Sequence, residues 1–523
     1  MKNPVNSFKE GIALYSMKVL PIYPKFPKTF WNYQKPIEFV GKKAAMPPTG
    51  LATVLSMLPE NFDPQKIIDL NTRVLTPEDF DDVDIVFTSS MIVQQESHEK
   101  IVKMAHEAGK KVVAGGPFPT TYPDLNGADY IVGGEAEMTL QPFLEDLVAG
   151  NARRIYGEAD VSKDNVLLTK TGRVDITRTP LPRWDLLNLE DYFSAAIQYS
   201  RGCPFDCDFC DITKLFGKES RTKTPEQMTR ELDALYSGGF RGSVFIVDDN
   251  FIGNRSNVRG LLPELISWQE RHDRPFSFFT EASMNLAWDN NADILDGMSE
   301  AGFNYVFMGI ESADDDVLKG MSKGQNTRMN PLDAVRRIQR AGIEVSGGFI
   351  VGSDGEQRDS VEKLYTFIQE AGIPVAMAGL LTAVRGTNLY NRLESEGRIR
   401  EETTGDNTHG FELNYDPDRS EEEVIGDYKE LLGKLYDPKN YFDRCRTLQE
   451  HMDVKTSSHQ FSLENIVTVG RSIKAQLFAP GGLEYAKYLV GTAIKNPSYL
   501  PHAIAEAIKF SHFQEVTQEY LAE

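Results

Sequence analysis

The chain has 523 residues, of which 41% are hydrophobic and 25% are charged, and it carries a formal net charge of −21. This length exceeds one ordinary domain and predicts two to four, and no apolar run reaches the roughly 18 residues that a membrane-spanning helix needs. So acidic a surface repels phosphate backbones, which argues against nucleic acid as the main partner.

The N-terminus and the distribution of cysteines indicate the compartment in which this protein works. The N-terminus lacks the apolar core and the small-residue cleavage site of a signal peptide. Three of the four cysteines lie together on one short stretch, which is not the pattern of a disulfide framework. The sequence therefore predicts a cytoplasmic protein in a reducing compartment.

The first 150 residues alternate expected strands and helices. The expected strands cover 17–23, 67–70, 83–88, 111–114 and 128–132, and the expected helices cover 47–58, 97–109 and 138–148. This alternation predicts a doubly wound parallel sheet. Such sheets bind ligands at the carboxyl ends of their strands, and two of these ends read Ser89-Ser90-Met91 and Gly115-Gly116.

Residues 151–194 are expected to be a linker. Residues 151–174 suggest a small β-hairpin, and a proline-rich segment follows at 179–185.

A second alternating pattern begins at residue 195. Its expected strands are 195–200, 243–247, 276–280, 305–310, 344–351 and 375–384, with helices at 225–237, 256–271, 291–300, 331–341 and 359–371. Six such units predict a partial (β/α)6 barrel of the TIM type. Active sites of these barrels lie at the carboxyl ends of the strands, where this chain has Asp248-Asp249-Asn250, Glu281 and Glu311. For each carboxylate alone, a helix N-cap or a solvated loop end is the alternative.

The clearest motif follows the first of these strands. Cys203, Cys207 and Cys210 have the spacing C-x3-C-x2-C, and Cys445 lies far downstream. Three thiolates on one loop hold three corners of a tetrahedral site and leave the fourth open, as in iron–sulfur sites that do chemistry. The alternative is a zinc site, which needs four ligands, but no His or Cys occurs within 50 residues after Cys210.

This motif, at the start of a β/α array, resembles that of the radical S-adenosylmethionine (SAM) enzymes. The resemblance implies a 4Fe–4S cluster on the three cysteines, with SAM chelating the open iron. It also implies a SAM site at the strand ends, where Asp248 and Asp249 stand in place of the family's Gly-Gly-Glu motif. The implied SAM contacts are Phe209, Asp248, Asp249, Glu281, Glu311, Gly348, Ile350 and Gly352. No catalytic residue is assigned.

The N-terminal sheet resembles the cobalamin-binding domain that often precedes a radical SAM barrel. Ser89-x-Met91 and Gly115-Gly116 match the segments that line the channel for the cobalamin tail, which implies that Ser89, Met91, Gly115 and Gly116 contact cobalamin. The family's lower-ligand loop, Asp-x-His-x-x-Gly, has no counterpart here, because residues 24–33 contain no histidine. Many radical SAM methylases also lack this histidine.

After residue 387 the pattern becomes helical, with expected helices at 420–436, 443–452 and within 460–523. This extension resembles that of the subgroup with the hopanoid C-2 methylases and the bacteriochlorophyll side-chain methylases. A helix near 489–510 suggests either a packed helical subdomain or a peripheral membrane contact. The expected domains are thus a cobalamin-binding-like domain at 1–150, a linker at 151–194, a radical SAM core at 195–387 and a helical extension at 388–523.

These observations lead to a functional hypothesis. The chain is expected to be a cobalamin-dependent radical SAM C-methyltransferase that acts on an unactivated carbon of an apolar small molecule and takes electrons from an external donor such as flavodoxin or ferredoxin. One alternative is a radical SAM enzyme with a vestigial N-terminal domain, which couples, cyclises or oxidises its substrate. The other is a zinc-stabilised binding protein.

Overall fold

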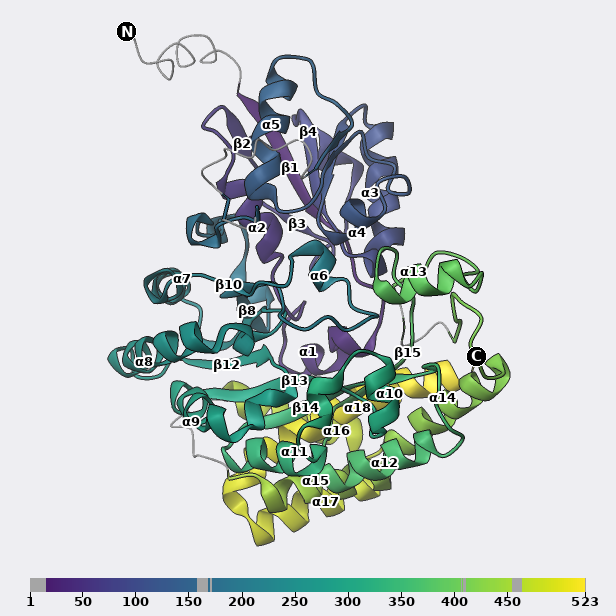
Figure 1. Ribbon diagram of the computed structural model, residues 1–523. Helices are drawn as coiled ribbons and strands as arrows, with labels where there is room; N and C mark the ends of the chain where they lie inside the picture. Colours follow the sequence, from purple (N-terminus) through teal and green to yellow (C-terminus); the bar gives the residue numbers. More distant parts are fainter. Residues whose placement is uncertain are drawn as a thin grey trace. The chain divides into compact units, whose positions relative to one another are not determined.

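The computed structural model describes residues 16–157, 168–169, 172–405, 407, 411–453 and 463–522. It divides into two compact units (Figure 1). Met1–Pro27 and Met46–Tyr192 form the first, whereas Lys28–Ala45 and Phe193–Glu523 form the second. The segment Lys28–Ala45, which contains helix α1 (Gln34–Phe39), therefore belongs to the second unit although it lies early in the sequence.

The first unit is built around a parallel sheet with the order β2-β1-β4-β5-β6-β7, in which β3 also pairs with β1. The strands are β1 (Met17–Tyr23), β2 (Phe62–Pro64), β3 (Ile68–Asp69), β4 (Ile85–Ser89), β5 (Lys111–Gly115), β6 (Tyr130–Val132) and β7 (Ile155–Tyr156), and the helices are α2 (Thr49–Ser56), α3 (Gln95–Glu107), α4 (Pro117–Thr121) and α5 (Ala136–Val148).

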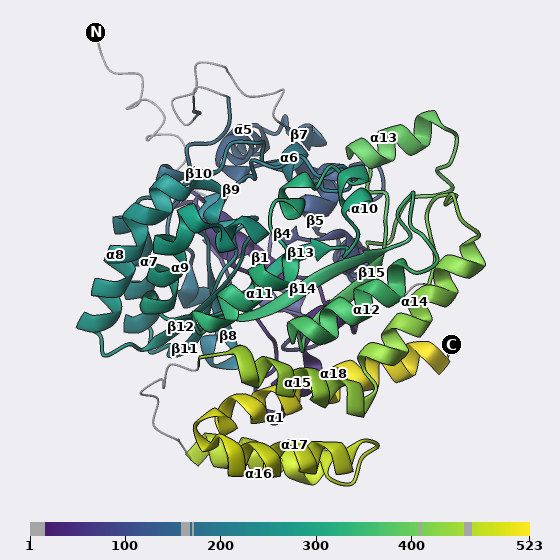
Figure 2. The same cartoon turned by 60° about the horizontal axis from the view of Figure 1, so that its bottom comes forward.

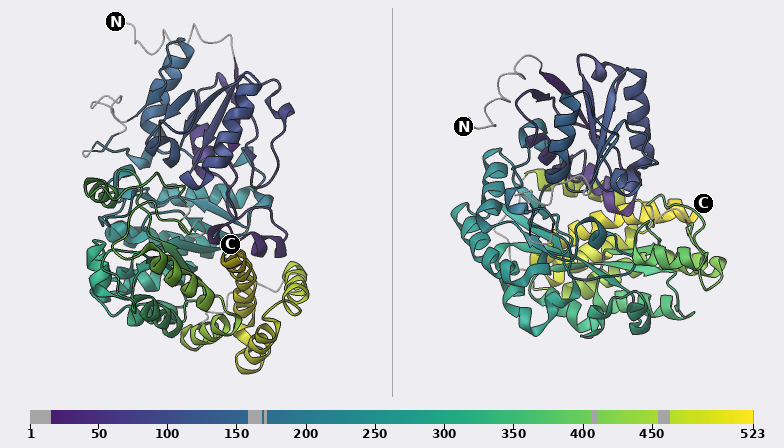
Figure 3. Two further views of the ribbon diagram at one scale, coloured as in Figure 1. Left: turned by 90° about the vertical axis from the view of Figure 1, so that its right-hand side faces the viewer. Right: turned by 45° about the horizontal axis from the view of Figure 1, so that its top comes forward.

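Helices cover both faces of this sheet (Figure 3). Ile101 and Val102 of α3 pack in one core cluster with Val112 of β5. Phe143 of α5 packs against Tyr130, which pairs in register with Val113, so α5 lies on the opposite face. The expected doubly wound sheet is confirmed.

The second unit holds a six-stranded parallel sheet with the order β15-β14-β13-β12-β11-β8. The strands are β8 (Ser194–Ile197), β11 (Gly242–Ile246), β12 (Phe276–Glu281), β13 (Phe303–Glu311), β14 (Glu344–Val351) and β15 (Ala376–Leu380), and the intervening helices include α7 (Pro225–Ser237), α8 (Arg255–Arg271), α9 (Ala292–Ala301), α10 (Asp315–Gly320), α11 (Pro331–Arg340) and α12 (Ser360–Ala371). This is the predicted succession of six β/α units.

Alternation along the strands separates a helix-facing side from an inner side. In β12, Phe276, Phe278 and Thr280 are buried, whereas Ser277, Phe279 and Glu281 are half-buried. The buried set faces the helices, so Glu281 shares the inner side with Phe279. Phe279 stacks on Phe245 of β11 with ring centroids 4.6 Å apart, and the inner side is thus partly aromatic.

The C-terminal part of the second unit is helical (Figure 2). It comprises α13 (Asn388–Ser395), α14 (Glu421–Leu435), α15 (Pro438–His451), α16 (Leu463–Gln476), α17 (Gly482–Lys495) and α18 (Leu500–Ala522). The helix expected near 489–510 is wrong as one element, because α17 ends at Lys495 and a short 3₁₀ turn at Pro497–Tyr499 precedes α18. The proline at this position cannot donate the helical hydrogen bond.

Only part of the expected linker hairpin can be compared. Leu168 and Val174 form an antiparallel bridge, and residues 158–167, 170 and 171 lie outside the described residues. Within the described part of the chain, no helix has the length and apolar character needed to cross a bilayer.

Candidate cluster and cofactor site

The three clustered cysteines lie on the loop between β9 (Ser200–Arg201) and α6 (Ile212–Leu215), beyond the carboxyl end of β8. Strand β9 pairs antiparallel with β10 (Arg221–Thr222) on the far side of the loop. Gly202 opens the loop with a φ of +91°, and a Cβ there would lie 2.5 Å from the carbonyl oxygen of Glu219. Only glycine fits this position, so the entry into the loop is fixed by the sequence.

All three thiols are free and half-buried. Burial raises the pKa of Cys203 and Cys207, and it raises the pKa of Cys210 to about 12. The neighbouring thiols add to these shifts, so the three sulfurs are close enough to repel one another as thiolates. A bound metal centre relieves that repulsion, and three soft thiolates with no fourth protein ligand on the loop fit a 4Fe–4S cluster with one open iron.

Two side-chain amides point at sulfurs of this loop. Asn250 Nδ2 donates to Cys203 Sγ at 3.7 Å, and Gln325 Nε2 donates to Cys207 Sγ at the same distance. Asn250 is held from the other side, because its Oδ1 accepts from the backbone N–H of Ser283 at 3.2 Å. Asn250 comes shortly after β11, whereas Gln325 lies in a short 3₁₀ turn at Gly324–Thr327, so two segments that are distant in sequence direct N–H groups at the cysteines.

Asp248 and Asp249 come just after β11, and their carboxylates accept hydrogen bonds from the start of the cysteine loop. Asp248 Oδ1 accepts from the backbone N–H groups of Tyr199 and Ser200 at 2.8 and 2.9 Å, and its Oδ2 accepts from Ser200 Oγ at 2.6 Å. Asp249 Oδ2 accepts from Gly202 N at 2.8 Å. Burial raises the pKa of Asp248 to about 7 and that of Asp249 to about 6, while these hydrogen bonds lower them. Both carboxylates thus position the loop, and their contact with SAM stays a prediction.

Glu281 ends β12 on the inner side of the sheet. Burial, together with the charges of Asp249 and Asp248, raises the pKa of its carboxyl to about 8. No hydrogen bond joins its side chain to another described residue. A carboxyl group that is desolvated and faces two other carboxylates suits a cationic ligand, which would stabilise the charged form.

Glu311 reaches the site through a bulge. The register between β13 and β14 shifts between Gly309 and Glu311, and Glu311 has a φ of +69°. Its carboxylate pairs with the buried ammonium of Lys323. A Cβ at Gly309 would overlap Glu311 Oε1 and lie 2.6 Å from Lys323 Nζ, so the ion pair occupies the space that the missing side chain leaves. The Lys323 charge also lowers the pKa of Cys207, against the effect of burial.

The remaining expected SAM contacts lie near the same edge. Phe209 is half-buried, and Lys323 Nζ lies 5.5 Å from its ring centroid. Gly348 and Ile350 are in β14, and Gly352 follows it with a φ of +97°. The N–H of Gly352 donates to Glu356 Oε2 at 2.9 Å and its carbonyl accepts from Tyr415 at 2.6 Å, so both its polar backbone groups are already engaged. Direct contact of these residues with SAM stays a prediction.

Lys323, Gln325 and the amide role of Asn250 were not among the predicted site residues. Asn250 directly follows Asp248-Asp249, and that position was the only signal for it. Lys323 and Gln325 lie in a turn more than 100 residues beyond the cysteines, and no motif marks them.

In the first unit, the expected cobalamin residues lie together at the carboxyl edge of the sheet. Ser90 N donates to Gly115 O at 3.2 Å, which joins the two strand ends. A Cβ at Gly116, where φ is +89°, would lie 2.7 Å from Ser89 Oγ, so the two segments approach as closely as glycine allows. Met91 is half exposed beside them. This small, polar strand edge fits the tail of a cofactor, and the contact itself stays a prediction.

The two histidines of the first unit are structural in this arrangement. His98 is buried, its Nδ1 hydrogen-bonds Ser90 Oγ at 3.1 Å, and its Nε2 lies 3.0 Å from Asn126 O. Burial lowers the pKa of His98 to about 4. His106 Nε2 pairs with Asp129 at 2.9 Å. Both imidazoles have partners within the domain, which agrees with the absence of a lower-ligand motif.

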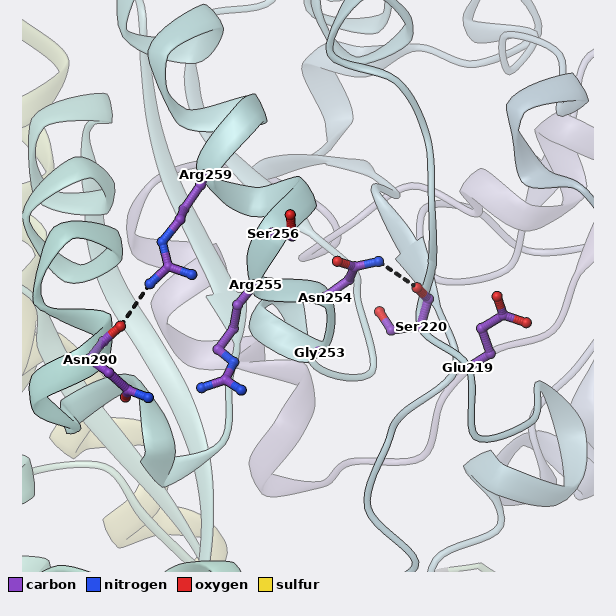
Figure 4. Close-up of a pocket in the computed structure, with 8 residues that line it drawn as sticks. All are labelled: Glu219, Ser220, Gly253, Asn254, Arg255, Ser256, Arg259 and Asn290. Carbon is purple, nitrogen blue, oxygen red and sulfur yellow. Dashed lines mark hydrogen bonds between the residues drawn. The ribbon is translucent and has the colours of Figure 1, made fainter.

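A separate open pocket of about 510 Å³ lies at the start of α8 (Figure 4). Asn254 Nδ2 donates to Ser220 O at 3.4 Å on one side of it, and Arg259 Nη2 donates to Asn290 O at 2.7 Å on the other. None of the expected cluster, SAM or cobalamin residues lines this pocket. Its lining consists of Glu219, Ser220, Gly253, Asn254, Arg255, Ser256, Arg259 and Asn290.

Comparison with known proteins adds three family matches. The B12 binding domain matches residues 43–144, the Radical SAM superfamily matches residues 197–368, and a domain of unknown function, DUF4070, matches residues 387–523. The matches follow one another along the chain in the order of the sheet, the barrel and the helical extension.

Relatives match along most of the length. An uncharacterized methyltransferase of Synechocystis sp. is 38% identical over 97% of this chain and 94% of the relative. The hopanoid C-2 methylase of Rhodopseudomonas palustris is 36% identical over 82% of this chain and 79% of the relative. In fold, the chain is similar to the radical S-adenosylmethionine methyltransferase TsrM of Kitasatospora setae, solved with cobalamin and a [4Fe-4S] cluster. The TM-score is 0.62 at 16% identity, with 97% of this chain and 100% of that chain covered.

Proposed function

Because this chain belongs to the radical SAM enzymes that carry a B12-binding domain, we propose that it methylates an unactivated carbon of an apolar small molecule. Family membership confirms the expected enzyme class and its three cofactors, a 4Fe–4S cluster, SAM and cobalamin. A zinc-stabilised binding protein does not fit this family. The observation that carries the proposal is the convergence of three free thiols, two amide N–H donors and a desolvated carboxyl at one edge of the barrel sheet.

When bound, these cofactors together supply hydrogen-atom abstraction by a 5′-deoxyadenosyl radical and methyl donation from cobalamin. The protein residues hold and orient them. Cys203, Cys207 and Cys210 would ligate the cluster, and Lys323 offsets the negative charge beside Cys207. The carboxyl of Glu281 would accept hydrogen bonds from the positively charged part of SAM.

The first unit would hold cobalamin at the edge formed by Ser89 and Gly116. Because its own histidines are engaged and residues 24–33 contain none, we expect that this unit would hold cobalamin without an imidazole of its own as a cobalt ligand. Any nitrogen superhyperfine splitting in the electron paramagnetic resonance spectrum of bound cob(II)alamin should then stay the same when the protein is labelled with ¹⁵N. A splitting that changes with the label would show a protein nitrogen bound to cobalt and contradict this expectation.

The aromatic side chains on the inner side of the barrel sheet support the proposal that the substrate is apolar. Phe245, Phe279 and Phe307 are half-buried on that side, next to the strand that ends in Glu281. Such rings offer apolar contact area without hydrogen-bonding groups. The hopanoid C-2 methylase relative, at 36% identity, is consistent with a substrate of this kind. Cleavage of SAM consumes an electron from outside the chain, so we also propose an external donor such as flavodoxin or ferredoxin in the cytoplasm.

The test is anaerobic turnover with SAM labelled in its methyl group and a lipid extract of the source cells. Each labelled product molecule should accompany one 5′-deoxyadenosine and one S-adenosylhomocysteine, because one SAM is cleaved and another remethylates cobalamin. Cys203→Ala should lose its iron and all 5′-deoxyadenosine, whereas Cys445→Ala, whose thiol is buried far from the loop in sequence, should keep both.

The same experiment tests the non-methylating alternative and the assignment of the cluster ligands. Formation of 5′-deoxyadenosine without corrin binding or methyl transfer would indicate coupling, cyclisation or oxidation and would overturn the methylation proposal. Retention of iron in Cys203→Ala would overturn the assignment of the cluster ligands.

A further inference from the structure

Helices α16 and α17 form an outer layer of the second unit (Figure 2), and their solvent-facing side is apolar. Phe478 is 87% exposed, Ile494 76% and Leu483 68%. Seven of the sixteen exposed large hydrophobic residues in the described chain lie within residues 467–494. We call these seven the apolar face: Val467, Ile473, Leu477, Phe478, Leu483, Val490 and Ile494.

The inward side of the same two helices is polar or phenolic. Ser472 and Gln476 of α16 are buried, and Gln476 Nε2 donates to Ser472 Oγ at 2.9 Å. Thr492 of α17 is also buried, and its Oγ1 donates to Gln449 Oε1 at 3.2 Å. Helices on the surface of a globular protein normally turn their aliphatic side chains inward and their polar ones outward. Here the aliphatic side chains are on the outside, so this layer exposes apolar surface to water, which is unfavourable.

The spacing on α17 places its exposed aliphatic side chains on one side. Leu483, Val490 and Ile494 are spaced by seven and four residues, which places them on one side of a helix, and Lys487 lies on the same side between Leu483 and Val490. The inward positions Tyr485, Tyr488 and Thr492 fall between them.

The charge around the apolar face is opposite to that of the whole protein. Residues 467–500 contain four basic side chains, Arg471, Lys474, Lys487 and Lys495, and one acidic side chain, Glu484, which gives a net charge of +3 in a chain of −21. Lys487 pairs with Glu484 at 2.7 Å. Lys474 and Lys495 are exposed, and neither ammonium makes a hydrogen bond or ion pair with another residue of the described chain.

We propose that the apolar face of α16 and α17 docks on a membrane surface that contains anionic lipid. Aliphatic and aromatic side chains that project from helices lying in the interface, flanked by lysine and arginine, are the combination that binds such surfaces. A second copy of the chain is a poorer occupant, because a two-fold interface would bring one net positive surface against another. An anionic bilayer offers both the apolar interior and the matching charge.

The experiment uses the full chain with the cofactors that it retains. The protein is sedimented with vesicles of phosphatidylcholine alone or with about one third phosphatidylglycerol, at about 0.1 M salt. The wild-type protein should bind the mixed vesicles, and its binding should weaken as salt is raised. Wild-type protein that stays in the supernatant with both vesicle types would overturn the proposal.

Two double variants separate the two contributions. Leu483→Glu/Ile494→Glu should lower partition to the mixed vesicles by at least about tenfold, because each buried aliphatic side chain contributes apolar area. Lys474→Glu/Lys495→Glu should lower it by about 25-fold or more, since each basic residue at an anionic surface contributes about a fivefold gain. Val74→Glu is the matched control, because Val74 is 81% exposed in the first unit and its substitution should change nothing.

A further measurement does not depend on the folding of the charged variants. Phe478→Trp should show an additional blue-shifted fluorescence on mixed vesicles, and an unshifted signal would overturn the proposal. If Leu483→Glu/Ile494→Glu instead converts a dimer to a monomer in light scattering and leaves vesicle binding unchanged, the apolar face is a self-association surface and the membrane proposal is wrong.

Discussion

At the scale of single residues, the amide of Gln325 is the clearest candidate for control over the cluster. Its Nε2 donates to Cys207 Sγ at 3.7 Å, and a hydrogen bond to a ligating sulfur stabilises the more negative, reduced cluster. Gln325→Leu should therefore lower the midpoint potential by roughly 20–60 mV, equivalent to the roughly 0.5–1.5 kcal/mol of one hydrogen bond. A redox titration monitored by electron paramagnetic resonance measures the shift.

The control for this prediction is Gln357→Leu. Gln357 is exposed, and its amide donates only to Gly355 O within the described chain. This variant should keep the wild-type potential. An unchanged potential in Gln325→Leu, with its iron content intact, would show that the amide does not influence the cluster.

Glu281 is expected to lower the stability of the cofactor-free protein and to strengthen the binding of SAM. Its pKa is raised from its ordinary value of 4.5 to about 8, chiefly by burial. For an acid shifted upward, the stabilising contribution is present below about pH 4.5 and is lost as pH rises through about 8. Glu281→Gln should thus stabilise the cofactor-free protein by roughly 1–3 kcal/mol at pH 8 and leave it unchanged at pH 4. It should also weaken SAM binding at least about tenfold, since the ionised carboxylate is the partner of a cation.

Thermal unfolding across this pH range and equilibrium dialysis with SAM test both halves. Glu231→Gln is the matched control, because Glu231 is a buried carboxylate that pairs with Lys223. Loss of that partner should destabilise the protein by about 3–5 kcal/mol. A destabilised Glu281→Gln with normal SAM affinity would make Glu281 a structural residue.

The residues of the site differ in how far the sequence could predict them. The cysteines have a fixed local spacing, and Glu281 lies at the end of a strand with clear alternation, so local sequence patterns are enough to predict both. Gln325 and Lys323 reach Cys207 only because the segment after α10 and the cysteine loop meet in space, where Asp208 N donates to Met321 O. No local pattern encodes that approach.

At the scale of elements, local signals placed most boundaries well. Helix α7 begins and ends at the predicted residues. Thr224 at the N-cap and Gln227 in the first turn form a capping box around Pro225, and Gly238 follows the last turn. The bulge that turns Glu311 toward Lys323 was not predicted. A bulge adds one residue to an ordinary strand pattern, and its position depends on the pairing with β14 rather than on composition.

This bulge can be tested through Gly309. A Cβ there would overlap Glu311 Oε1 and approach Lys323 Nζ. Gly309→Ala should therefore destabilise the protein by about 1–3 kcal/mol through overpacking and lower the iron retained per chain, because Lys323 lies beside Cys207. Chemical denaturation and iron analysis measure the two effects.

Gly260→Ala provides the comparison. Gly260 lies within α8 and a Cβ there meets no atom within 4 Å, so the change should stabilise the protein by about 0.5–1 kcal/mol through helix propensity. Equal effects of both substitutions would contradict the role given to the ion pair.

At the scale of the whole molecule, the chain passes between its two units three times. The segment Lys28–Ala45 leaves the first unit and returns to it, although its position in the sequence suggested a loop of the first domain. Its anchors come from the other end of the chain. Lys28 pairs with Glu515 and Glu519 of α18 at 2.7 Å, and Thr29 O lies 3.0 Å from His512 Nε2. Contacts over nearly 500 residues leave no trace in local periodicity, which explains why composition and spacing did not predict them.

A substitution at Phe30 tests whether the segment Lys28–Ala45 stabilises the second unit. Its side chain is fully buried and its ring centroid lies 5.5 Å from those of Tyr436 and Phe513. Phe30→Ala should cost about 3–5 kcal/mol, as expected for a large-to-small change in a core. The substitution should destabilise the second unit, which holds the barrel sheet, and the first unit should still bind cobalamin.

Scanning calorimetry with and without cobalamin distinguishes the two units, since a ligand raises the Tm of the unit that binds it. Phe143→Ala is the matched variant, because Phe143 is fully buried in α5 of the first unit and packs on Tyr130 and Tyr156. It should lower the cobalamin-sensitive transition, and Phe30→Ala should lower the other one. If both variants lower the same transition, the segment Lys28–Ala45 belongs energetically to the first unit. If they separate, an early stretch of the sequence is part of the core that supports the radical site.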